Sequence, residues 1–162
     1  MGMYTGLRCK VIVKPEFRQE FEFLNNEVQY EWTESNIDFL KEYGEYSRAT
    51  FIPRGGLSYM PDCWEDVPKN ENGDRDWRNA SPTDGFNREF NKETGLWTFQ
   101  CSLKNYESTI EYFLDNVLSI VVETIIHLEY YYEEWDKSIM FELIDGQITK
   151  SVKEGIKYNT YI

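Results

Sequence analysis

The hydrophobic pattern changes its period between Leu96 and Ile126, and this change constrains the fold more than any other feature. Leu96 to Leu103 alternates apolar with polar residues, as expected for a strand with one buried face. Asn105 can then cap a helix, because beyond it apolar residues recur at helical spacing. These residues are Ile110, Phe113, Leu114, Val117, Leu118, Val121, Val122, Ile125 and Ile126. We predict a strand followed by a long helix over 106–125 that is central to the core.

Further strands are expected where short runs alternate or are rich in β-branched residues, at 7–14, 47–52, 57–60, 86–90 and 127–135. Asp145-Gly146 lies between two alternating runs, 138–144 and 147–153, and indicates a final hairpin. Helices are expected after Pro15 and after Ser35, which are residue types that begin helices. The order of these elements predicts an α+β fold with a mostly antiparallel sheet and two to three helices packed on one face.

The chain of 162 residues has the size of one domain, and we expect a single domain over 1–162. Between residues 63 and 85 the periodicity is lost and turn-forming residues accumulate. A long irregular loop is therefore predicted at about 63–85. Trp64 and Trp77 within it favour docking of the loop on the fold, because burial of a large ring is favourable.

The charge is concentrated in two stretches. Residues 16–45 carry nine carboxylates and two basic residues, and residues 105–136 carry eight carboxylates and no Lys or Arg. The net charge of the whole chain is −12. A field of this sign repels nucleic acid and anionic membranes and attracts basic proteins, which predicts a basic protein partner.

No recognisable motif for catalysis or for metal or cofactor binding accompanies these charges. His127 is the only histidine, which excludes metal motifs that need two imidazoles. Cys9, Cys63 and Cys101 are widely spaced and odd in number, a pattern typical of free thiols in a reducing compartment. The longest apolar stretch, around Val117 to Ile126, is interrupted by polar residues and is too short to span a bilayer. We expect a cytoplasmic protein with no catalytic residues, metal or cofactor.

The segment from Glu129 to Trp135 is the most distinctive heptapeptide of the chain. If the neighbouring face packs under the helices, alternation exposes a row of carboxylates and aromatic rings. Such a row can lie along a basic partner, although an ordinary exposed strand is an alternative interpretation. The predicted partner-binding residues are Glu129, Tyr131, Glu133, Glu134 and Trp135, with Glu31, Glu34, Glu42 and Glu45 as a second patch.

In charge and size the chain resembles a functional class: immunity proteins against nuclease toxins, nucleic-acid mimics and phage-encoded inhibitors of nucleases or bacterial defence proteins. Members of this class are small, acidic and cytosolic. The resemblance implies a non-enzymatic protein-interaction module of the inhibitor or immunity type. Such a module would mask a basic surface of its partner and would bind neither nucleic acid nor membrane directly.

A second hypothesis is a ligand-binding domain, or a small enzyme, that uses the 63–85 loop as a lid. It would bind a phosphorylated or nucleotide-like molecule through Arg8, Arg48, Arg54, Trp64 and Trp77. A deep pocket in which arginine and aromatic side chains converge would favour this hypothesis, whereas a flat or convex acidic face would favour the interaction module. A structural subunit of a homo-oligomer is a third alternative.

Overall fold

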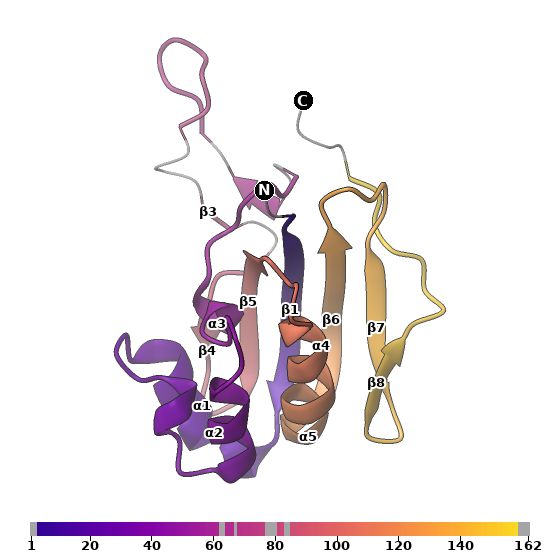
Figure 1. Cartoon of the computed structure of the whole chain (residues 1–162). Helices are drawn as coiled ribbons and strands as arrows, with labels where there is room; N and C mark the ends of the chain where they lie inside the picture. The colour runs from indigo at the N-terminus through magenta and orange to yellow at the C-terminus, as the bar shows by residue number, and fades with distance from the viewer. Residues whose placement is uncertain (1–2, 62–63, 67, 77–80, 83–84, 159–162) are drawn as a thin grey trace.

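The protein is built on a six-stranded antiparallel sheet. The computed structural model describes residues 3–61, 64–66, 68–76, 81–82 and 85–158, and the strand order is β4-β5-β1-β6-β7-β8 (Figure 1). The strands of this sheet are β1 (Thr5–Val13), β4 (Glu89–Phe90), β5 (Leu96–Leu103), β6 (Val122–Tyr132), β7 (Ile139–Ile144) and β8 (Gln147–Lys150). A separate pair is formed by β2 (Glu65–Asp66) and β3 (Ser81–Pro82). Together with the helices, this sheet confirms the predicted α+β class.

The helices form a layer on one face of the sheet (Figure 1). They are η1 (Pro15–Phe17), α1 (Arg18–Asn26), η2 (Trp32–Glu34), α2 (Asp38–Gly44), α3 (Phe51–Arg54), α4 (Thr109–Phe113), the π-helical η5 (Leu114–Leu118) and α5 (Ser119–Val121). Strands β1, β4, β5 and β6, with helices after β1 and β5, have the connectivity of a split βαβ fold. Each helix in the described ranges is too short or too polar to traverse a lipid bilayer.

The main core lies between the helices and the sheet. Odd-numbered residues of β1, including Leu7 and Val11, face the helices, as the alternation in the sequence predicts. Phe113 of α4 is central in this core. Its ring lies within 6.5 Å of four other aromatic rings, which belong to Trp32, Tyr43, Trp97 and Phe99. Helix α4 thereby joins the first helices of the layer to strand β5.

The long helix predicted over 106–125 is not found. Helical residues run from Thr109 to Val121, and Val122 begins β6. Val122 pairs with Val13 of β1, and Ile125 pairs with Val11. The β-branched run 121–126 fits a strand better than a helix once β1 offers hydrogen-bonding partners. A register shift next to Lys10 leaves Ile126 between paired residues, so its side chain is exposed.

Other predicted boundaries also differ. The strand predicted over 47–52 is wrong, because residues 47–50 form turns and residues 51–52 begin α3. Residues 57–60 form no strand, and of 86–90 only β4 is a strand. The Asp145-Gly146 hairpin between β7 and β8 is confirmed, and both turn residues have positive φ, as a tight hairpin requires. Parts of the predicted 63–85 loop, including Cys63 and Trp77, lie outside the described residues.

Candidate functional site

A buried group of polar side chains lies on the sheet face opposite the helices. Arg8 of β1 is 2% exposed, and Glu129 of β6, its neighbour across the strands, is 0% exposed. Arg8 Nη1 lies 3.8 Å from Glu129 Oε1. Arg8 Nε donates a hydrogen bond of 3.0 Å to Gln100 Oε1 on β5, and Nη1 donates one of 3.1 Å to the hydroxyl of Tyr158. Three strands and the C-terminal segment therefore meet at one guanidinium.

The carboxylate of Glu129 has its own set of partners. The Tyr158 hydroxyl donates to Glu129 Oε2 at 2.7 Å, and His127 Nε2 lies 2.9 Å from Oε1. Burial by itself would raise the pKa of Glu129, but hydrogen bonds from His127, Ser138 and Tyr158 favour the ionised form and leave the pKa lowered. Glu129 is therefore held as a buried, ionised carboxylate.

Aromatic rings enclose the arginine of this network. Arg8 Cζ lies 4.7 Å from the ring centroid of Trp64 and 4.5 Å from that of Phe86, distances at which a cation is attracted by a ring. Phe86 also packs edge-on against His127, with centroids 5.0 Å apart. The predicted docking of Trp64 is confirmed, since its side chain is 0% exposed. These rings exclude water and so strengthen the charge interactions beneath them.

Acid should remove the stability that depends on Glu129. Because the folded-state pKa lies below the ordinary value of 4.5, the unfolded chain binds the proton first as the pH falls. The contribution is complete above the ordinary pKa and is lost as the pH falls through the folded-state pKa. Urea unfolding of the wild type and Glu129→Gln at pH 6 and pH 3 measures this effect. We expect the difference in free energy of unfolding between the two proteins to be smaller at pH 3 than at pH 6. The same difference at both pH values would contradict the prediction.

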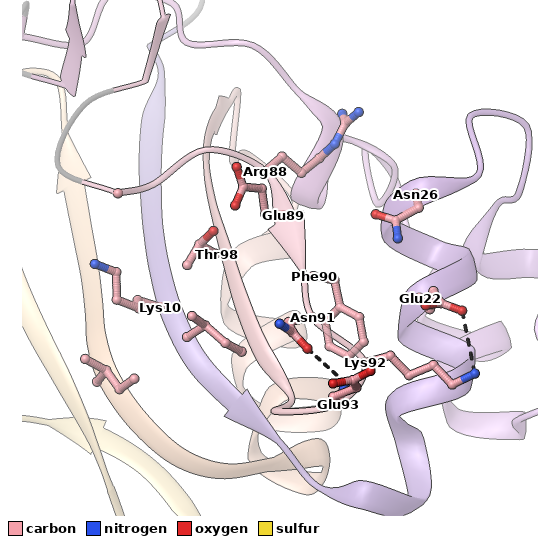
Figure 2. Close-up of a pocket in the computed structure, with 13 residues that line it drawn as sticks. Lys10, Glu22, Asn26, Arg88, Glu89, Phe90, Asn91, Lys92, Glu93 and Thr98 are labelled. Carbon is pink, nitrogen blue, oxygen red and sulfur yellow. Dashed lines mark hydrogen bonds and ion pairs between the residues drawn. The ribbon is translucent and has the colours of Figure 1, made fainter.

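An open hollow of about 1050 Å³ lies beside this network (Figure 2). Lys10 and Thr98, neighbours across β1 and β5, contribute to its wall, and Lys10 Nζ is 4.7 Å from the Phe86 ring centroid. Its charged lining residues are Lys10, Arg88, Lys92, Glu22, Glu89 and Glu93, three cations and three carboxylates. One of these pairs, Lys92 and Glu22, lies 3.9 Å apart. The formal charges of the lining residues therefore sum to zero.

No family model, curated protein or solved structure matches this chain. Arg8 and Glu129 bind each other and the same tyrosine, Tyr158, so that loss of either charged partner would leave the other buried and unpaired. Within the described part of the chain, no three His, Cys, Asp or Glu side chains are grouped to bind a metal ion.

The first acidic stretch and the helical part of the second, residues 105–121, meet in the helical layer. Tyr112 of α4 stacks on Tyr43 and Tyr46 at the end of α2, with ring centroids 6.2 and 4.3 Å apart. Burial and the nearby carboxylate of Glu42 raise the pKa of Tyr112. The exposed carboxylates of this layer, hereafter the acidic layer, are Glu16, Glu27, Glu34, Asp38, Glu42, Glu45, Glu107, Glu111 and Asp115. Within 16–45 and 105–121, both fully described, Lys41 is the only exposed basic residue.

The side chains of the predicted partner-binding row, Glu129 to Trp135, differ in their exposure to solvent. The expectation that Glu129 and Tyr131 face outward is wrong, because both side chains are 0% exposed. The face opposite the helices is covered there by Trp64 and Tyr158, whose rings lie 6.1 and 5.5 Å from that of Tyr131. Of the remaining row, Glu134 is exposed, and Glu133 and Trp135 are half-buried. In the second patch Glu34, Glu42 and Glu45 are exposed and Glu31 is half-buried.

The residues of the ligand hypothesis are only partly brought together. Arg8 and Trp64 are in contact, as described above. Arg54 instead donates hydrogen bonds to the carbonyl oxygens of Leu24, Glu27 and Val28 at the end of α1. Arg48 is half-buried, and its guanidinium lies 5.9 Å from the Tyr106 ring centroid. Trp77 lies outside the described residues.

The sequence did not point to five members of this network, which are Phe86, Gln100, His127, Ser138 and Tyr158. One signal was present, because Arg8, Gln100 and Glu129 occupy the polar face of three alternating strands. Opposite charges on matching faces of strands are compatible with a buried pair as well as an exposed one. In this protein the pair is buried, because Trp64 and Tyr158, near the C-terminus, cover this face of the sheet.

Proposed function

We propose that this protein is a non-enzymatic, acidic interaction module that covers a basic surface of a protein partner. The observation that carries the proposal is the acidic layer, in which residues 16–45 and 105–121, two segments far apart in the sequence, come together with Lys41 as their only exposed basic residue. Such a field speeds the encounter with a basic protein and disfavours partners of like charge. The half-buried rings of Tyr46 and Tyr112 supply aromatic contact area within the same surface.

The proposed partner is a protein that normally uses its basic surface to bind nucleic acid, such as a nuclease or a defence protein. The proposed role, inhibitor or immunity-type protein in the cytoplasm, follows from that chemistry, since a carboxylate surface can occupy the sites that phosphates would take. The ligand-binding alternative has less support. Its arginines Arg48 and Arg54 make other contacts, and the hollow beside Arg8 has a balanced charge.

Charge reversal in the acidic layer tests the proposal. The partner is first captured from native lysate at low salt and identified by mass spectrometry, and its association rate with purified protein is then measured. For the variant Glu34→Lys, Glu42→Lys, Glu45→Lys we expect the association rate to fall by about tenfold or more, with a weaker dependence on salt.

The matched control reverses three exposed carboxylates outside the acidic layer, Glu71→Lys, Asp74→Lys and Glu154→Lys, and has the same net charge. Its association rate should stay closer to that of the wild type. Equal association rates of the two triple variants would mean that only the net charge of the protein, and not the position of the carboxylates, affects association. An unchanged association rate of the acidic-layer variant would show that the partner does not bind at the acidic layer.

A further inference from the structure

Two aromatic rings stand at the surface of the first helix and the loop after it. Phe23 of α1 is 40% exposed, and its ring centroid lies 5.7 Å from that of Tyr30. Val28, in the same loop, is 80% exposed. Isolated apolar residues at a surface are common, but paired rings beside an exposed valine form an apolar patch.

Two hollows meet at Tyr30. One, of about 410 Å³, is lined by Glu16, Gln19, Glu20, Phe23, Tyr30 and Asn36. The other, of about 480 Å³, is lined in part by Val28, Tyr30 and Glu34. The charged lining residues of both hollows are the carboxylates Glu16, Glu20, Glu27 and Glu34, with no Lys, Arg or His among them. We call these two spaces the Tyr30 hollows.

Neighbouring residues hold this surface in place. The Tyr30 hydroxyl donates to Glu20 Oε1 at 2.7 Å, and Ser35 Oγ donates to Glu20 Oε2 at 3.0 Å. Arg54 binds the backbone carbonyls of Glu27 and Val28 and so fixes the loop that carries Tyr30. Burial and the hydrogen bond to Glu20 raise the pKa of Tyr30 to about 12. The rings and carboxylates are therefore presented in a defined arrangement.

Resting on the proposed function, we infer that the Tyr30 hollows receive an arginine side chain of the basic partner. A guanidinium can stack on an aromatic face and can also bind a carboxylate with two parallel hydrogen bonds. Phe23 and Tyr30 supply the rings, and Glu16 and Glu34 supply carboxylates among the lining residues. A lysine ammonium lacks the planar shape, so the same surface should discriminate between the two basic side chains.

The test uses hexa-arginine, hexa-lysine and hexa-citrulline peptides with the full chain, followed by amide NMR shifts at low salt. We expect hexa-arginine to shift amides of residues 16–36 and to bind about threefold more tightly than hexa-lysine, with no binding of the uncharged citrulline peptide. Phe23→Ala should weaken hexa-arginine binding by about two- to fivefold, the range of an exposed cation–ring contact. Phe23→Tyr retains a ring and should bind like the wild type.

Phe51→Ala is the matched control, because Phe51 is 44% exposed and lines neither of the Tyr30 hollows. Equal affinities for Phe23→Ala and Phe51→Ala, with no preference for arginine over lysine, would overturn the arginine site while leaving a general acidic interaction surface. Failure of both cationic peptides to shift any amide of the acidic layer would overturn the inference and count against the proposed function as well.

Discussion

Glu129→Gln is expected to lower the free energy of unfolding by about 3–5 kcal/mol, because it leaves the guanidinium of Arg8 buried without its charged partner. Arg8 is 2% exposed and Glu129 0% exposed, so solvent cannot replace the lost interaction. The same change also disturbs the hydrogen bond from Tyr158 and the contact with His127. The measurement is urea unfolding at neutral pH, followed by circular dichroism.

Two further variants separate the ion pair from a general effect of substitution. Glu134→Gln removes an exposed carboxylate of the same segment and should change stability by no more than about 0.5 kcal/mol. The double variant Arg8→Met, Glu129→Leu removes both charges and should be more stable than Glu129→Gln, because no unpaired charge remains buried. A Glu129→Gln variant as stable as Glu134→Gln would show that the pair contributes little.

Phe113→Ala is expected to destabilise the protein by about 3–5 kcal/mol, the usual cost of removing a buried aromatic ring. Phe113 is 0% exposed and contacts rings from the helical layer, such as Trp32 and Tyr43, and from strand β5, such as Trp97. The cavity would therefore open between the helices and the sheet. Urea unfolding again provides the measurement.

The matched control is Phe51→Ala, the same substitution at a side chain that is 44% exposed. It should cost much less, about 1 kcal/mol or below, because little packing is lost at a surface position. Phe113→Leu retains much of the side-chain volume and should cost about 1–2 kcal/mol. If Phe113→Ala were no less stable than Phe51→Ala, other contacts would have to hold the helical layer to the sheet.

Local patterns explain which parts of the fold could be predicted. The alternation in 7–14 and 96–103 predicts strands β1 and β5 with their buried faces, and Asp145-Gly146 predicts the last hairpin. The predictions were wrong where one sequence pattern is compatible with both a helix and a strand, or with both a strand and a turn. The run after Val121 fits a helical stripe, but its β-branched residues and its pairing with β1 make it the start of β6. Segment 47–52 has strand composition but forms turns before α3.

The candidate site was less predictable than the fold. The carboxylates of the second patch, Glu34, Glu42 and Glu45, are exposed as expected for a contact surface. Glu129 is not, because its exposure depends on Trp64 and Tyr158, which approach from distant parts of the chain. No local pattern contains that information, since burial of one sheet face depends on which segments return to cover it.

By itself the sequence determined the α+β class, the apolar faces of β1 and β5 and the strong acidity of two separate stretches. These properties are local, because a side chain's period and charge are present in the residues themselves. The tertiary structure alone decided that Arg8 and Glu129 form a buried pair and that residues 16–45 and 105–121 share one acidic helical layer. Both outcomes depend on long-range strand register and helix packing, which bring together residues far apart in the chain.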